Sequence, residues 1–196
     1  MRKYVLLLSL LTLIACSPEA SADDAFVTLE PLEESNTAKS TKRLALGPVM
    51  EFDLTFQDPE NTKLDVWIER YHEGELFNPD SKHFRTVDEN IKHANRTIGW
   101  FIVDPQADLL DMRLYDFDES GSTTGSNKFE SNINSNPISH GFLIDGSIDL
   151  EKSQEYTIAV FNQSNNENSI KAYDDVDQIL NNNRVVYLMK VQVEEK

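Results

Sequence analysis

Acidic and hydroxyl side chains alternate in one short stretch, Asp116-Phe117-Asp118-Glu119-Ser120-Gly121. Alternate spacing can bring the side-chain oxygens of Asp116, Asp118 and Ser120 around one point, and the glycine permits a sharp turn after them. Carboxylate and hydroxyl oxygens are hard ligands of the kind that calcium prefers. Calcium binding at Asp116, Asp118 and Ser120 is therefore one chemistry that the sequence predicts.

This stretch resembles the opening of an EF-hand calcium loop. The resemblance fails at the twelfth position, where Asn127 stands in place of the bidentate glutamate, although Glu130 could supply a further ligand. The residues before the loop, 109–117, alternate in the manner of a strand, whereas an EF-hand needs a helix. The alternative interpretation is a polar hairpin loop that follows this strand.

A second candidate lies in residues 64–71, where Trp67, Glu69 and Tyr71 share one face of a predicted strand. A face that mixes aromatic rings with a charge suits a partly exposed surface for binding a peptide or a sugar. Large aromatic side chains more often pack than bind, so the alternative is that Trp67 and Tyr71 cover the sheet beneath a loop.

Signatures of enzymatic catalysis are missing from the sequence. The four histidines, His72, His83, His93 and His140, lack the spacing of a zinc site, and the chain has no GxSxG nucleophile motif. A glycosidase needs two carboxyl groups at a set separation, and the sequence gives no means of choosing two from 34 acidic residues. We therefore predict no catalytic residue, and a surface hydrolase of cell-wall or sugar substrates stays an alternative.

The N-terminus has the organisation of a secretory signal: Met1-Arg2-Lys3 is basic, and a short apolar run follows it. The run ends in Leu13-Ile14-Ala15-Cys16, which resembles the lipobox of bacterial lipoprotein signal peptides. The resemblance implies cleavage before Cys16 and a lipid, diacylglycerol with palmitate, on this residue. Cys16 is the only cysteine, so its lipidation leaves no thiol for a disulfide, a nucleophile or zinc.

The resemblance to a lipobox implies that the protein lies outside the cytoplasm and is held at a membrane by lipid. The chain looks broadly like short lipoproteins of Gram-positive bacteria, which favours the cell membrane of such a host. Ser17, after the lipidated cysteine, would suit the outer membrane in a host that has two membranes.

The chain is strongly acidic, with 34 acidic and 18 basic residues and a net charge of −16. Loss of residues 1–15 would make this charge two units more negative, because Arg2 and Lys3 would be removed. Binding nucleic acid requires a basic surface that displaces counterions, so the composition argues against such partners.

Residues 16–43 are polar and contain two prolines, and we expect them to form a lipidated N-terminus and a flexible tether. The alternative for residues 25–29, Ala-Phe-Val-Thr-Leu, is an additional edge strand. The remainder, residues 44–196, is predicted to fold as a single domain. Short segments of alternating apolar residues predict an antiparallel β-sandwich of about seven or eight strands, with long polar loops. The strands are expected at 50–56, 64–71, 97–103, 109–117, 142–150, 156–161 and 185–193, the short helices at 86–94 and 174–180, and a long polar loop at 118–136.

These features together predict a monomeric, lipid-anchored β-sandwich that acts as a binding or accessory module of the cell envelope, with an envelope protein or glycan as its partner. The alternatives are the surface hydrolase and a calcium-dependent adhesion or sensing domain.

Overall fold

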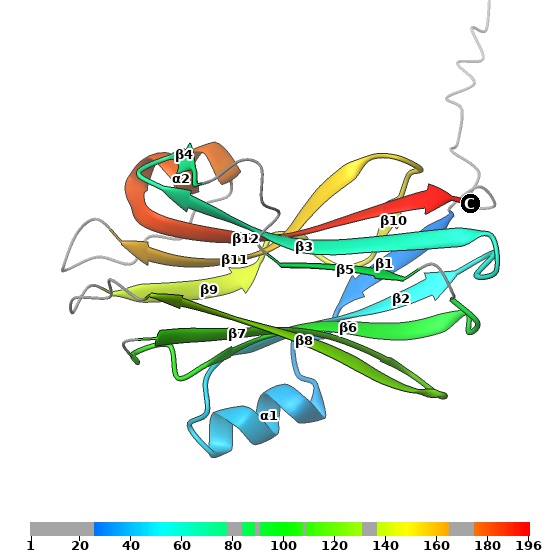
Figure 1. Ribbon diagram of the computed structural model, residues 1–196, viewed down its shortest axis with the longest axis horizontal. Coiled ribbons are helices and arrows are strands. Elements are labelled where there is room, and N and C mark those ends of the chain that lie inside the picture. Colours follow the sequence, from blue (N-terminus) through cyan, green and yellow to red (C-terminus); the bar gives the residue numbers. More distant parts are fainter. Residues whose placement is uncertain (1–25, 78–83, 89–90, 108, 131–136, 165–174) are drawn as a thin grey trace, which may run out of the picture.

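Two antiparallel sheets pack face to face in the computed structural model (Figure 1), which describes residues 26–77, 84–88, 91–107, 109–130, 137–164 and 175–196. The first sheet has the strand order β10-β1-β2-β6-β7-β8. The second has the order β4-β3-β12-β11-β9, and β5 also pairs with β3. The predicted all-β sandwich is confirmed, with twelve strands in the described part of the chain in place of seven or eight.

The first sheet consists of β1 (Val27–Pro31), β2 (Val49–Phe56), β6 (Asn95–Val103), β7 (Leu109–Asp118), β8 (Gly121–Glu130) and β10 (Ile148–Leu150). The second consists of β3 (Thr62–His72), β4 (Glu75–Leu76), β5 (Phe84–Asp88), β9 (Ile138–Phe142), β11 (Glu155–Ser164) and β12 (Asn183–Glu195). The two helices are α1 (Asn36–Arg43), beneath the first sheet in Figure 1, and α2 (Val176–Asn182), beside β4.

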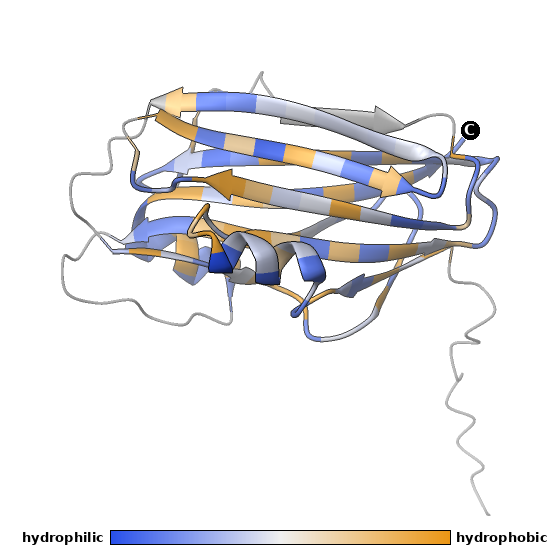
Figure 2. Cartoon of the chain, turned by 90° about the horizontal axis from the view of Figure 1, so that it is seen from below, coloured by the Kyte–Doolittle hydropathy of each residue, from blue (hydrophilic) through white to orange (hydrophobic). Residues whose placement is uncertain are grey.

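The core lies between the sheets and follows from the period-2 alternation of the strands, visible as alternating hydrophobic and hydrophilic bands in Figure 2. In β2, Phe52 and Leu54 are 0% exposed, as the alternation predicts. Phe52 meets Phe142 of the opposite sheet edge to face, with ring centroids 5.2 Å apart. Burial on this scale stabilises the fold without disulfides.

The predicted tether is too long, because residues within 16–43 belong to the folded domain. Strand β1 lies between β10 and β2, and Val27 and Leu29 are both 0% exposed. Helix α1 begins at the N-cap Ser35, whose hydroxyl accepts a 3.0 Å hydrogen bond from the Ala38 N–H. The prediction missed α1 because its sequence is polar and carries no apolar stripe.

Two further predictions of local structure are wrong. Residues 84–88 form strand β5 on β3, where a helix over 86–94 was expected, because sheet pairing overrides the local capping pattern. Residues 121–130 form strand β8, where a loop was expected. This strand pairs with β7 from Asp118↔Gly121 to Leu109↔Glu130, and its Ser, Thr and Gly residues hide the strand from a search for apolar alternation.

The expected strand over residues 142–150 is divided between the sheets. Strand β9 ends at Phe142 in the second sheet, and β10 begins at Ile148 in the first. Gly146 lies between them with a φ of +74°, a conformation that glycine adopts without steric cost. The helix expected at residues 174–180 is present as α2.

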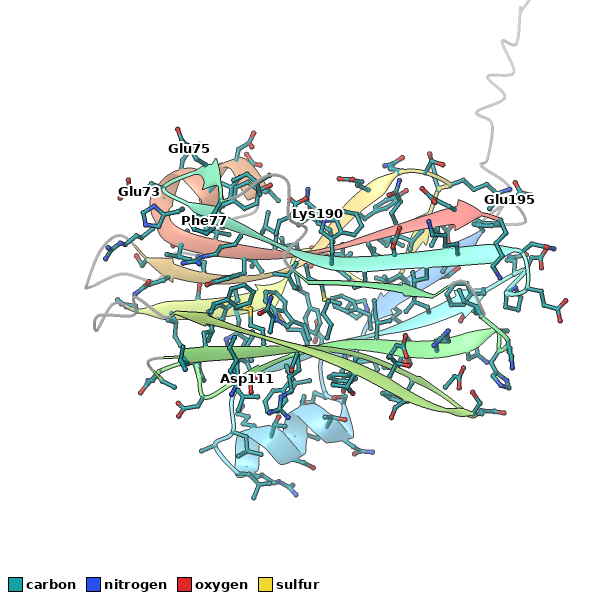
Figure 3. The ribbon with its side chains drawn as sticks, in the orientation of Figure 1. Glu73, Glu75, Phe77, Asp111, Lys190 and Glu195 are labelled. Atoms are coloured by element: carbon teal, nitrogen blue, oxygen red, sulfur yellow. The ribbon has the colours of Figure 1, made fainter. Side chains whose placement is uncertain are left out.

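The two ends of the sandwich are marked by different residues. Glu73, Glu75 and Phe77 lie at one end, and Glu195 lies at the other (Figure 3). Val27 pairs with Phe56, the last residue of β2, and Glu195 pairs with Thr62 across the short β2–β3 connection. The first residues of β1 therefore lie at the same end as Glu195.

Candidate functional site

The acidic stretch at residues 116–121 forms the turn of the β7–β8 hairpin. One carboxylate oxygen of Asp118 accepts a 2.7 Å hydrogen bond from the Ser120 backbone N–H and a 2.6 Å bond from the Ser120 hydroxyl. These bonds lower the pKa of Asp118 below its ordinary value. The geometry is that of an Asx turn, so this stretch is the polar hairpin that was the alternative to an EF-hand loop.

Asp116 faces the space between the sheets, where it forms an ion pair with Arg96 of β6. The Arg96 Nη2 to Asp116 Oδ1 distance is 3.2 Å, and the two side chains are only 6% and 10% exposed. Asp116, Asp118 and Ser120 do line one cavity of about 350 Å³, together with the cationic side chains of Lys92 and Arg96.

Those two cations oppose the entry of another cation into the cavity. Across the described residues, no group of three or more His, Cys, Asp or Glu side chains could hold a metal ion. Calcium binding at this turn stays a prediction.

The aromatic cluster of β3 is packed. Trp67 is 0% exposed, so the predicted binding surface at this residue is wrong, while Tyr71 is half-buried. Both donate to the Glu69 carboxylate, Trp67 Nε1 at 3.0 Å and the Tyr71 hydroxyl at 2.7 Å. Lys190, labelled in Figure 3, lies 2.9 Å from the same carboxylate.

The hydrogen bonds stabilise the ionised form of the Glu69 carboxyl more than burial destabilises it. Burial raises the pKa of the Glu69 carboxyl, but the bonds from Lys190, Trp67 and Tyr71 outweigh burial and lower the pKa overall. Burial, followed by the bond to Glu69, raises the pKa of Tyr71. This cluster joins β3 to β12.

The predicted lipidation site, Cys16, lies outside the described residues. No helix among the residues that the structure describes is long and apolar enough to cross a membrane. Of the histidines, His83 is also outside the described residues, and only His140 lines one of the cavities described here.

The largest of these cavities is a groove of about 730 Å³ built from segments that are far apart in the sequence. Helix α1 supplies Ala38 and Lys42, and the start of β2 supplies Val49 and Met50. The groove is completed by Glu33, by Ala45, Gly47 and Pro48 after α1, by Asp104, Pro105 and Gln106 in the β6–β7 turn, and by His140, Gly141 and Phe142 in β9. We call this feature the α1–β9 groove.

Gly47 fixes one wall of the α1–β9 groove. Its φ is +126°, and a Cβ atom at this position would lie 1.9 Å from the carbonyl oxygen of Ile102. Only glycine therefore allows the segment after α1 to approach β6 so closely. The approach is held by the Asp104 N–H, which donates to the Leu46 carbonyl at 2.9 Å.

The charges of the α1–β9 groove are few and mixed. Glu33 and Asp104 are its carboxylates, Lys42 is its ammonium group, and all three are exposed. His140 is exposed at the surface, yet crowding by neighbouring atoms lowers the pKa of its imidazole below the ordinary value. Apolar side chains form most of the remaining lining.

Sequence reasoning missed this groove, apart from noting His140 as one of four histidines. Its lining residues come from a predicted tether, two turns and an edge strand, and no motif links them. The only local signal was the Gly47-Pro48 pair, which marks a chain reversal and says nothing of a cavity.

Comparison with known proteins gives one family. A family model described as the YgaN domain matches residues 32–193. The match begins directly after β1 and ends two residues before the end of β12, so it covers most of the sandwich. No curated protein and no solved structure matches the chain.

Proposed function

The chain belongs to the YgaN domain family, and we propose that it is a lipid-anchored binding module of the bacterial cell envelope whose ligand site is the α1–β9 groove. The observation that carries the proposal is the groove itself. Its volume of about 730 Å³ falls within the range of ligand sites, roughly 300–1,000 Å³, and it combines an apolar lining with a few polar groups.

The proposed lipid anchor is compatible with this role. The lipid on Cys16 would hold the end of the sandwich where β1 begins, because only residues 17–26 separate it from Val27. The groove includes the start of β2, and Val49 lies at the opposite end of this strand from Phe56, the partner of Val27. The groove would therefore lie at the end of β2 that is farther from the point where the linker enters the domain.

The anchor is tested by a Cys16→Ala change in the producing cell. We expect the variant to leave the membrane fraction after a carbonate wash, because the proposed attachment is a thioether-linked lipid. A Ser17→Ala variant is the matched control and should stay in the membrane pellet. Retention of the Cys16→Ala protein in that pellet would contradict lipid anchoring.

The groove is tested by photo-crosslinking in intact cells, with a benzoylphenylalanine at position 106. Gln106 lines the groove and is exposed, so the probe can reach a bound ligand. We expect a discrete adduct that disappears when Ala38→Trp fills the groove from α1. Ser40→Trp, at an exposed position of the same helix outside the lining, should leave the adduct unchanged. An adduct equally strong in both variants would refute the groove as the ligand site.

A further inference from the structure

Strand β9 ends the second sheet, and among the strands that the structure describes it pairs with β11 alone. Two backbone bonds fix the phase of this pairing: Ser164 N–H donates to the Pro137 carbonyl at 3.0 Å, and Leu143 N–H donates to the Ile158 carbonyl at 2.9 Å. Antiparallel bonding alternates along a strand, so the backbone of the odd-numbered residues bonds β11. The N–H and C=O groups of Ile138, His140 and Phe142 point the other way, toward the free edge.

Among the described edge strands, which include the ten-residue β8 with its Lys128 and Glu130, β9 is the one without a charged residue. Exposed edges are normally very short or carry charged side chains, which prevent unwanted pairing. Strand β4 has two residues, and β10 has three. Strand β9 has five residues, Ile-Ser-His-Gly-Phe, and no lysine, arginine, aspartate or glutamate among them.

The α1–β9 groove is bordered by the last three residues of this edge strand. Alternate side chains of a strand point to opposite faces, yet His140, Gly141 and Phe142 are consecutive and all line the groove. His140 and Phe142 share one face of β9, and Gly141, which has no side chain, lines the groove with its backbone. A Cβ atom on Gly141 would meet nothing within 4 Å, so the face of β9 opposite to His140 and Phe142 is open at this residue.

The charges around the edge favour one kind of peptide. The groove has two carboxylates, Glu33 and Asp104, against the single ammonium of Lys42, within a chain of net charge −16. An acidic segment would be repelled, whereas a basic segment would be attracted. Phe142 and Val49, both partly exposed, provide an apolar wall for alternate side chains of an extended strand.

We infer that the α1–β9 groove binds a basic, extended peptide segment of another protein, which pairs with the free edge of β9 as an additional strand. This inference rests on the proposed function and names the ligand class of the same groove. Backbone bonds to Ile138, His140 and Phe142 give affinity, and apolar side chains at alternate positions enter the groove.

The probes are nine-residue peptides that alternate valine with lysine, added to the lipidated full chain in detergent micelles. A glutamate counterpart tests the charge. Two N-methylated counterparts carry methyl groups either on the valine amides or on the lysine amides. In an extended strand each set of amides faces one side, so methylation of one set removes the bonds to β9 and methylation of the other set does not.

We expect the lysine peptide to bind, the glutamate peptide to bind more than about tenfold more weakly, and only one methylated peptide to lose binding by more than about tenfold. Hydrogen exchange should slow at the amides of His140 and Phe142. Exchange at Gly141, whose amide already faces β11, should not change. Equal binding of both methylated peptides, or no binding of the lysine peptide, would overturn strand addition.

Two variants of one residue separate backbone pairing from side-chain contact. His140→Pro removes an N–H that faces the free edge and leaves the ladder to β11 intact, which edge strands tolerate. His140→Ala keeps that N–H. We expect binding to be lost in the first and kept in the second. If His140→Pro retains binding and Ala38→Trp abolishes it, strand addition fails while the groove stands as the ligand site.

Discussion

Replacing Leu29 with alanine is expected to lower the free energy of unfolding by about 2–5 kcal/mol, the usual cost of emptying a fully buried leucine site. Leu29 is 0% exposed and lies in β1 between Leu54 of β2 and Ile148 of β10. For a domain of this size about 1 kcal/mol corresponds to roughly 2–4 °C, so the melting temperature should fall by at least about 4 °C. Thermal and urea unfolding followed by circular dichroism would measure the change.

The matched control is Leu44→Ala, a leucine from the end of α1 that is 67% exposed. Its expected effect is within about 0.5 kcal/mol, because it fills no core site. The two leucines flank the boundary that the sequence predicted between tether and domain. Equal, small effects of both changes would show that β1 is not an integral part of the folded domain.

The fold was predictable wherever burial alternates along a strand. In β2, every second residue is apolar and buried, and this alternation alone predicts the buried face: Met50, Phe52, Leu54 and Phe56. The strand begins and ends close to the predicted bounds. Strand β8 shows the limit of this reasoning. Its pairing with β7 depends on backbone bonds, and residues such as Ser122 and Thr124 carry no apolar signal.

The candidate site was less predictable than the fold. The residues that the sequence singled out as candidate ligand-binding groups form structural contacts within the fold: Trp67 donates to Glu69, and Asp116 pairs with Arg96. The groove depends on how α1 and β9 are brought together by the rest of the fold, and neither element contains a functional motif. A sequence reports local patterns, whereas a groove built from three separate segments exists only after folding.

Replacing Asp116 with alanine is expected to cost about 3–5 kcal/mol of unfolding free energy, because it removes one partner of a buried ion pair. The change leaves the Arg96 guanidinium, which is 6% exposed, without this counter-charge. Asp118→Ala is the matched control on the same strand. It should cost only about 0.5–1.5 kcal/mol, the worth of an ordinary hydrogen bond, because Asp118 bonds Ser120 at an exposed turn.

A double change separates the loss of a pair from the loss of packing. Arg96→Met with Asp116→Leu replaces both charges by apolar groups, and we expect it to restore most of the stability that Asp116→Ala loses. Melting in calcium and in magnesium adds a direct test of the calcium prediction. If the ion pair is the role of Asp116, the two ions should shift melting equally and weakly, through the net charge alone. A rise of several degrees with calcium only, lost in both Asp116→Ala and Asp118→Ala, would instead establish the hairpin turn as an ion site.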